Sequence, residues 1–410
     1  MSRQPAGGRS ERVLLHGGRV FDGSGAPAAK ADVLLVDGRI HEVGPGLDGD
    51  AGVDVSGATV LPGFFDCHVH LTASGVDLME RLDRPFSYQF YAAARHLEDT
   101  LATGVTTVRD AGGSDLGIQR AVADGLVAGP RVLIAVNIIG QTGGHTDGWF
   151  PSGFDVPLGL PHPGRPAALA DGVDELRKVV RSLLRAGADV IKICTTGGVL
   201  SPRDDPEHTQ FSPEEIAVVV AEAAAAGRGV MAHAQGTNGI KNAVRAGVRS
   251  IEHGMYLDEE AIDLMLAHGT WLVPTLVAPR AVIAAAEAGA QLPAAVVRKA
   301  REVSEVHQQS VRAAVAAGVP VAMGTDSGVG PHGQNLDELP LMQECGMTPA
   351  QVLVSATSGA ARLCGLQDET GRVAPGLAGD LVVLDGDPDD LTGLRDRIRQ
   401  VWLDGRRAVG

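Results

Sequence analysis

The sequence has few aromatic residues and little positive charge, and both shortages argue against a nucleic-acid-binding protein. Phe, Trp and Tyr make up 3% of the 410 residues, which leaves little surface on which bases could stack. The formal net charge is −15, whereas binding a phosphate backbone requires a concentrated basic face. We therefore expect no nucleic-acid partner, and we expect the acidic charge to favour solubility.

Paired cysteines and long apolar runs are also missing. The four cysteines, Cys67, Cys194, Cys345 and Cys364, stand far apart without zinc-finger or redox spacing, so no disulfide framework is expected. No apolar run approaches the roughly 20 residues that cross a bilayer. The amino-terminal segment lacks the apolar core of a secretory signal. These absences predict a soluble, cytoplasmic protein with no membrane partner.

The middle of the chain repeats one local pattern, in which a helical stretch ends at Gly and a short apolar, β-branched strand follows. We expect these glycines to adopt the left-handed conformation that ends a helix. They are Gly104, Gly129, Gly187, Gly227, Gly247, Gly269 and Gly318. With residues 59–71 in front, alternating β and α units over about 300 residues predict an α/β fold, a distorted TIM-type (β/α)8 barrel. A doubly wound open sheet is less favoured, because no GxGxxG follows the first strand.

Both ends of the chain depart from this pattern. Residues 1–60 and 366–410 have the character of short strands separated by Gly and Asp turns. Neither segment alone offers enough strands to bury both faces of a sheet. We therefore expect the two segments to form one small, discontinuous β-sandwich domain, and residues 61–365 to form the barrel.

Polar residues that are unusual in apolar strands fall at the ends of five predicted strands. They are His68 and His70, Lys192, His233, His253 and Asp326. In a barrel the carboxyl ends of the strands meet at one face. His68 and His70 are two residues apart, so both side chains project to the same side of their strand and can hold one ion. The combined set predicts a metal centre at this face.

Lys192 stands among Val190, Ile191 and Ile193, where burying an ammonium is costly and would repel a metal ion. A desolvated lysine loses its proton and can act as a nucleophile or form a Schiff base. It can also add carbon dioxide and become an anionic carbamate that bridges two cations. The imidazoles and the aspartate favour the carbamate, because bound metals would neutralise it.

This set of residues resembles the binuclear amidohydrolase superfamily, and the resemblance covers nearly the whole chain. It includes LPGFFDCHVHL, the flanking β segments and the closing PGLAGDLVVLD. The segments TTVRDAGG, GGHTDG, TTGGVLSPRDDPEHTQFS and GIKNAVRAGVRSIEHGMYLDEEAI are most similar to the metal-dependent Xaa-Pro dipeptidase and carboxypeptidase group, which is related to imidazolonepropionases.

The resemblance implies two divalent metal ions, and zinc is the expected occupant because imidazole and carboxylate ligands suit it. Cobalt, manganese and iron stay open from the ligand types. The implied ligands are His68, His70 and Asp326 for the first ion and His233 and His253 for the second, with carboxylated Lys192 bridging both. The implied nucleophile is a hydroxide shared by the ions, and Asp326 would carry its proton to the leaving amine.

The resemblance also suggests substrate contacts. It places His145 beside the substrate carbonyl or carboxylate, with a loop histidine bonded to backbone as the alternative. Arg203 could meet a substrate carboxylate or face solvent, and Tyr256 could reach the substrate or only pack. Gln235 stands where several dipeptidase relatives carry an aromatic residue or histidine, which leaves the preferred dipeptide open. Asp66 and Asp110 are expected to support the site rather than react.

The expected activity is hydrolysis of an amide bond in a dipeptide of the Xaa-Pro type or in an N-acyl amino acid. Cyclic amides, lactones, carbamates and organophosphates stay open as substrates, and so does a non-catalytic metal-binding relative. A mononuclear deaminase is less favoured, because it would not need Lys192. Relatives in this family often form oligomers, so the resemblance alone suggests a homo-oligomer.

Overall fold

The computed structural model describes residues 12–156 and 159–410, and the chain divides into two compact units. One unit combines Met1–Phe64 with Pro349–Gly410, and the other is Phe65–Thr348. Helices α11 (Pro349–Ser355) and α12 (Ser358–Cys364) therefore belong to the terminal unit, although the sequence suggested a boundary at residue 366. One hydrogen bond ties α12 to the amino-terminal segment of this unit, since Ser358 Oγ donates to the carbonyl of Gly23 at 2.6 Å.

The described part of the terminal unit contains two sheets, of strand orders β5-β4-β1-β6 and β18-β17-β16-β7-β2-β3. Their strands are β1 Arg12–His16, β2 Arg19–Val20, β3 Ala29–Lys30, β4 Asp32–Val36, β5 Arg39–Gly44, β6 Ala51–Asp54, β7 Ala58–Pro62, β16 Leu381–Asp385, β17 Ile398–Leu403 and β18 Arg406–Val409. Antiparallel pairing of β16 with β7 joins the two ends of the chain. Leu15 and Leu35 of one sheet share a core with Val60, Val383 and Trp402 of the other.

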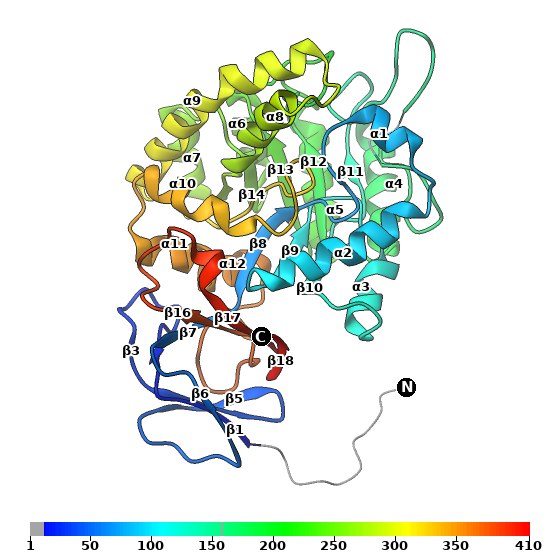
Figure 1. The fold of residues 1–410 in the computed structure, drawn as a ribbon. Helices are drawn as coiled ribbons and strands as arrows, with labels where there is room; N and C mark the ends of the chain where they lie inside the picture. Colours follow the sequence, from blue (N-terminus) through cyan, green and yellow to red (C-terminus); the bar gives the residue numbers. More distant parts are fainter. Residues whose placement is uncertain (1–11, 157–158) are drawn as a thin grey trace. The chain divides into compact units, whose positions relative to one another are not determined.

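The second unit is built on parallel strands with helices around them (Figure 1). The strands are β8 Phe64–Val69, β9 Val105–Asp110, β10 Arg131–Ile134, β11 Ile138–Ile139, β12 Val190–Cys194, β13 Gly229–Ala234, β14 Ser250–His253 and β15 Trp271–Val273. The helices are α1 Leu78–Asp83, α2 Tyr88–Ala102, α3 Leu116–Ala123, α4 Gly172–Arg185, α5 Pro213–Ala225, α6 Thr237–Ala246, α7 Glu259–His268, α8 Val277–Glu287, α9 Ala294–Ala317 and α10 Glu338–Glu344. Among the described residues, no helix is long and apolar enough to cross a membrane.

Local sequence features explain where the helices form. In α4, Leu176, Val180 and Leu183 recur at helical spacing and are buried on one face. At the start of α5, the Ser212 hydroxyl accepts from the Glu215 N–H while the Glu215 carboxylate accepts from the Ser212 N–H. This reciprocal cap satisfies two backbone donors at the first turn and fixes where the helix begins.

Backbone hydrogen bonds also link the parallel strands beyond the regular ladders. Leu272 N of β15 donates to Pro320 O at 2.8 Å, and Cys67 N of β8 donates to Met323 O at 2.9 Å. Residues 320–327 therefore lie between β15 and β8, the place expected of an eighth strand, but they form only isolated bridges. The expected third strand is interrupted as well, since Val136 has a φ of 67° between β10 and β11.

The helix-ending glycines follow the prediction with one exception. Six of them have positive φ values, and Gly318 at the end of α9 has a φ of 88°. The prediction for Gly129 is wrong, because α3 already ends at Ala123 and the left-handed glycine there is Gly125, with a φ of 72°. Gly129 serves a close approach instead, since a Cβ at that position would lie 2.9 Å from Leu97 Cβ.

Replacing Gly318 by Ala should lower the free energy of unfolding by about 1 kcal/mol, because the left-handed backbone crowds a Cβ against the following carbonyl. No neighbouring atom lies within 4 Å of the added Cβ, so the effect isolates the backbone conformation. Urea unfolding measures it, and Gly318→Asn should cost less because Asn tolerates this conformation. An Ala variant as stable as the parent would show that the helix does not end in this way.

Candidate active site

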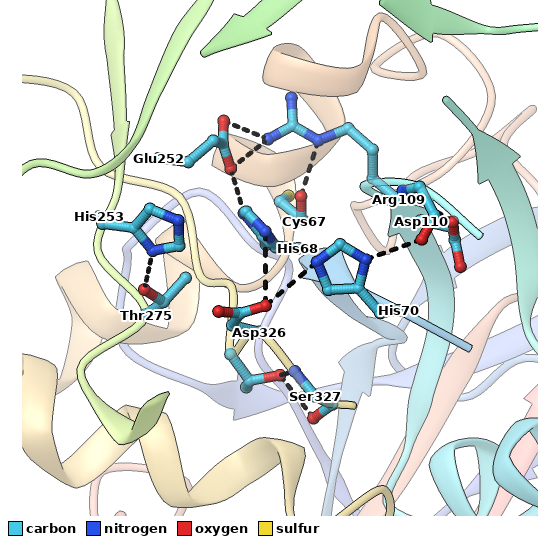
Figure 2. A network of polar contacts seen from close by, with 12 residues as sticks. Cys67, His68, His70, Arg109, Asp110, Glu252, His253, Thr275, Asp326 and Ser327 are labelled. Carbon is cyan, nitrogen blue, oxygen red and sulfur yellow. Dashed lines mark hydrogen bonds and ion pairs between the residues drawn. The ribbon is translucent and has the colours of Figure 1, made fainter. Parts of the chain in front are cut away.

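Three of the predicted ligands meet where β8 and residues 320–327 end. Nε2 of His70 lies 3.2 Å from Asp326 Oδ1, and Nε2 of His68 lies 3.6 Å from the same oxygen (Figure 2). One ligand atom from each of these side chains lies within 4.8 Å of the others. His68 and His70 share this side of the strand because they are two residues apart. The group is compact enough to hold one cation.

The other predicted histidines continue from this group as a chain of ring contacts. The ring centroids of His68 and His253 are 5.1 Å apart, and those of His253 and His233 are 4.7 Å apart. His145, from the loop after β11, stacks on His233 with a centroid distance of 4.3 Å. His68, His233 and His253 are all buried. The strands therefore gather five predicted site residues, with Asp326, into one polar centre.

Hydrogen bonds on the outer side of the imidazoles fix which ring nitrogen carries the proton. His68 Nδ1 lies 2.7 Å from Glu252 Oε2, His70 Nδ1 lies 2.7 Å from Gly112 O, and His233 Nε2 lies 3.0 Å from Gly197 O. A carboxylate or a carbonyl can only accept, so each of these nitrogens is the donor. Burial lowers the pKa of His68 and His233, so the second nitrogen of these two rings keeps a lone pair, which is the form that binds a metal. The second nitrogen of His70 faces the Asp326 carboxylate at 3.2 Å. For His253, whose Nδ1 lies 2.8 Å from Thr275 Oγ1, either atom can donate.

Two predicted ligands sit on left-handed backbone. His253 has a φ of 73° and Asp326 a φ of 60°, and neither is glycine. Such residues are uncommon and persist only where the surroundings hold them. His307 Nε2 donates to His253 O at 2.9 Å, and Asp326 N donates to His68 O at 2.7 Å. The backbone therefore turns sharply at both positions, as is frequent at functional sites.

Lys192 on β12 is buried, and no residue that the structure describes accepts a hydrogen bond from its Nζ. Burial lowers the pKa of Lys192, against the opposing attraction of Glu252 and Asp326. Burial together with the Lys192 charge lowers the pKa of His68 to about 4. An ammonium here would repel a cation, so the donor set fits a metal centre if Lys192 is neutral or carries an anionic carbamate.

A buried ion pair behind His68 is a functional feature that the sequence interpretation missed. Arg109 Nη2 lies 3.0 Å from Glu252 Oε1, and Arg109 Nε donates to Cys67 O at 2.7 Å (Figure 2). Burial alone would raise the pKa of Glu252, but Arg109 and His68 hold it at about 2. Glu252 is therefore a carboxylate that orients His68. The signal was the same as for Lys192, namely a charged residue inside a buried strand.

Asp66 and Asp110 support the backbone around the site. Asp110 accepts from Leu71 N at 2.8 Å and from Ser114 Oγ at 2.7 Å. Asp66 accepts from Thr325 Oγ1 at 2.6 Å and from Asn335 Nδ2 at 2.8 Å. These bonds tie down the chain beside His70 and Asp326. Burial raises the pKa of Asp66 to about 6, despite these donors.

The four residues predicted to contact the substrate lie in different surroundings, and not all of them lie beside the histidines. His145 Nδ1 lies 2.7 Å from Ser201 Oγ, in addition to its stack on His233. Gln235 is buried after β13, where its N–H donates to Thr196 Oγ1 at 2.9 Å. Tyr256 packs beside Val199 and Met255. Arg203 is exposed, with its guanidinium carbon 4.7 Å from the centroid of the Phe150 ring, and is not gathered with the histidines.

A buried group of imidazoles, a carboxylate and a lysine to which no described residue offers a hydrogen-bond acceptor, at the ends of parallel strands, is typical of a metal-dependent hydrolase. The chain belongs to the amidohydrolase family, which it matches over residues 59–408, and it is an enzyme of that class. This confirms the resemblance in the sequence. Enzymes of the family use divalent metal ions and act on small molecules.

Several relatives align over nearly the whole chain. Ochratoxinase from Aspergillus niger is 33% identical over 423 residues, which cover 97% of this chain and 87% of that protein. A crystal structure of a Xaa-Pro dipeptidase with methionine bound in the active site is 34% identical, has a TM-score of 0.89 and covers 97% of this chain and 100% of that one. A prolidase complexed with N-methylphosphonate-L-proline is 37% identical, with a TM-score of 0.89 and coverage of 97% and 99%. These structures share the α/β fold of this chain.

Replacing Glu252 by Gln should weaken metal binding by about 10- to 100-fold, because His68 loses the carboxylate that orients it. Competition with a chelator, using Zn²⁺, gives the dissociation constant. Glu260→Gln is a matched control, since Glu260 also pairs with two cations, Lys241 and Arg245, but is exposed on α7. Equal metal affinity in Glu252→Gln and the parent would contradict a role for Glu252 in orienting His68.

Proposed function

We propose that the chain is a binuclear metal-dependent amide hydrolase that cleaves a dipeptide of the Xaa-Pro type or an N-acyl amino acid. The observation that carries this proposal is the close approach of His68, His70 and Asp326 beside the buried Lys192, whose Nζ has no hydrogen-bond acceptor among the described residues. The relatives support the choice of substrate class. One of them binds methionine and another binds N-methylphosphonate-L-proline, and both ligands contain an amino acid.

The proposed metal ligands lie on a distorted (β/α)8 barrel, with residues 320–327 as its eighth strand. His68, His70 and Asp326 would hold the first ion and His233 and His253 the second, and a carboxylated Lys192 would supply a ligand to both. Zinc suits this mixture of imidazole and carboxylate donors. When bound, the two ions would lower the pKa of a coordinated water and polarise the substrate carbonyl.

Asp326 is the proposed proton carrier. Burial opposes ionisation, but interactions with the neighbouring His70 and His68 imidazoles lower the pKa of Asp326, so it is a carboxylate at neutral pH. As a carboxylate it can accept the proton of the attacking water. It then delivers that proton to the nitrogen of the leaving amine as the C–N bond breaks.

The loops above the strand ends are proposed to bind the substrate. His145, stacked on His233 and bonded to Ser201, would present its other ring nitrogen to the substrate carbonyl or carboxylate. Gln235 and Tyr256, which follow β13 and β14, are proposed to line the same space. Arg203 would contact a substrate carboxylate only after leaving the Phe150 ring. A cytoplasmic location and a homo-oligomeric state stay predictions.

Replacing Asp326 by Asn should lower kcat for amide cleavage by about 100-fold or more, because the amide can neither accept nor deliver the proton. The assay measures free amino acid released from a panel of dipeptides and N-acyl amino acids by metal-loaded protein. Asp263→Asn, which changes an exposed aspartate on α7, is the control. A metal-loaded Asp326→Asn variant with parental kcat would contradict the role of Asp326. Turnover of lactones or organophosphates without any amide turnover would contradict the proposed function.

Carboxylation of Lys192 can be observed directly. The neutral amine would attack the carbon of carbon dioxide and lose one proton to solvent, leaving an anionic carbamate. Protein loaded with metal in isotopically labelled bicarbonate should show a carbamate carbon resonance by NMR. That resonance should be lost in Lys192→Ala and kept in Lys178→Ala, which removes an exposed lysine of α4. A metal-loaded parent without the resonance would rule out the carbamate.

A further inference from the structure

A second buried lysine lies outside the proposed metal centre. Lys299, on the long helix α9, is 6% exposed. Its Nζ donates to Gly198 O at 2.6 Å, to Ser201 O at 2.6 Å and to Asp204 O at 3.1 Å. All three acceptors are backbone carbonyls of the loop that follows β12. The Lys299 ammonium therefore holds three carbonyls of one turn, residues 198–204, close to one another.

The side chains of the same turn hold His145. Ser201 Oγ donates to a carboxylate oxygen of Asp204, which can only accept, so the hydroxyl oxygen is left to accept from His145 Nδ1 at 2.7 Å. His145 N also donates to Gln210 Oε1 at 3.1 Å, near the end of the loop. The orientation of the imidazole is thus set by the loop that Lys299 fastens.

The turn that Lys299 holds also packs directly against His145. A Cβ added to Gly198 would lie 2.2 Å from His145 Cε1, so the Gly198 backbone is in close contact with the imidazole. The carbonyl of this residue is one of the three that Lys299 binds. Gly197, whose O accepts from His233 Nε2 at 3.0 Å, precedes this turn and has its own anchor, because its N–H donates to His208 O at 2.9 Å. A shift of this turn would therefore displace the His145 ring.

The chemistry of lysine suits this arrangement. Burying an ammonium is unfavourable unless its three donors are satisfied, and here three carbonyls satisfy them. The Asp204 carboxylate, whose Oδ1 lies 3.7 Å from Nζ, supplies the opposite charge. An apolar residue at this position would leave three carbonyls of a tight loop without their donor, and each such loss is unfavourable when buried.

We propose that Lys299 is a positioning residue, which holds the turn 198–204 so that Ser201 and Asp204 orient His145 over His233. The described contacts of Lys299 Nζ are with Gly198, Ser201 and Asp204, so it acts through the loop. The proposal extends the proposed function, because it depends on that function for the role of His145 toward the substrate. Its structural part, the fastening of the loop, is independent of any substrate.

The test compares Lys299→Met with Lys241→Met. Lys241 is a matched control, because it is a lysine of α6 whose Nζ is held by Asp258 at 2.7 Å and by Glu260 at 2.6 Å, away from this loop. In Lys299→Met we expect amide hydrogen exchange over residues 197–210 to rise about tenfold or more. We expect kcat/KM for amide cleavage to fall about 10- to 100-fold through the displaced His145, with the metal content unchanged. Lys241→Met should change none of these.

Two further variants keep the proposal testable if Lys299→Met does not fold. Lys299→Arg keeps the charge and should retain most of the loop protection. Ser201→Ala should lower kcat/KM while the exchange of the loop stays close to that of the parent, because the fastening is intact. Parental exchange in Lys299→Met, loss of metal in step with activity, or parental kcat/KM in Ser201→Ala would each overturn the proposal.

Failure of the proposed function would be distinguishable. If the parent cleaves no amide, the exchange measurement still decides whether Lys299 fastens the loop. The position of His145 is then followed by its imidazole NMR signal, identified by its loss in His145→Gln. A signal that shifts in Lys299→Met and not in Lys241→Met supports the positioning role, and an unshifted signal contradicts it.

Discussion

The arrangement at the strand ends depends on hydrogen-bond acceptors that stand behind the imidazoles. Glu252, Gly112 O and Gly197 O each accept the N–H of one histidine, which turns the second ring nitrogen toward the centre. Within the described part of the chain, Lys192 Nζ and Asp326 Oδ1 are buried there without a hydrogen-bond partner. Burying such groups is unfavourable unless something pairs with them, and divalent cations with a carbamate would do so.

The fold supplies this centre by bringing strand ends together and then bending the chain at them. His253 and Asp326 occupy left-handed backbone, and their neighbours hold that conformation through hydrogen bonds from His307 and to His68 O. The loop after β12 is held by a different kind of contact. Lys299 on α9 binds the loop after β12, so the part of the site that would meet the substrate is held from the outer helices rather than from the strands.

Much of the centre could be predicted from the sequence, because it follows from periodicity. Two histidines two residues apart share a face, and a lysine inside an apolar strand is conspicuous. The Arg109–Glu252 pair was harder to foresee, since it joins side chains 143 residues apart and requires knowledge of which strands face each other. The prediction from local sequence that Gly129 ends a helix was also wrong. Close packing against Leu97 explains this glycine instead. Arg203 shows the same limit, because a loop side chain has no periodicity to place it.

The family membership and the buried centre agree on metal-dependent hydrolysis of a C–N bond, and the substrate is selected by loops that the strands do not determine. The central claim is that two ions complete the centre. Titrating metal-free protein with Zn²⁺ while amino acid release is recorded tests it most directly. The account predicts that activity rises until about two metal equivalents per chain are bound. Full activity in protein without measurable metal would contradict it.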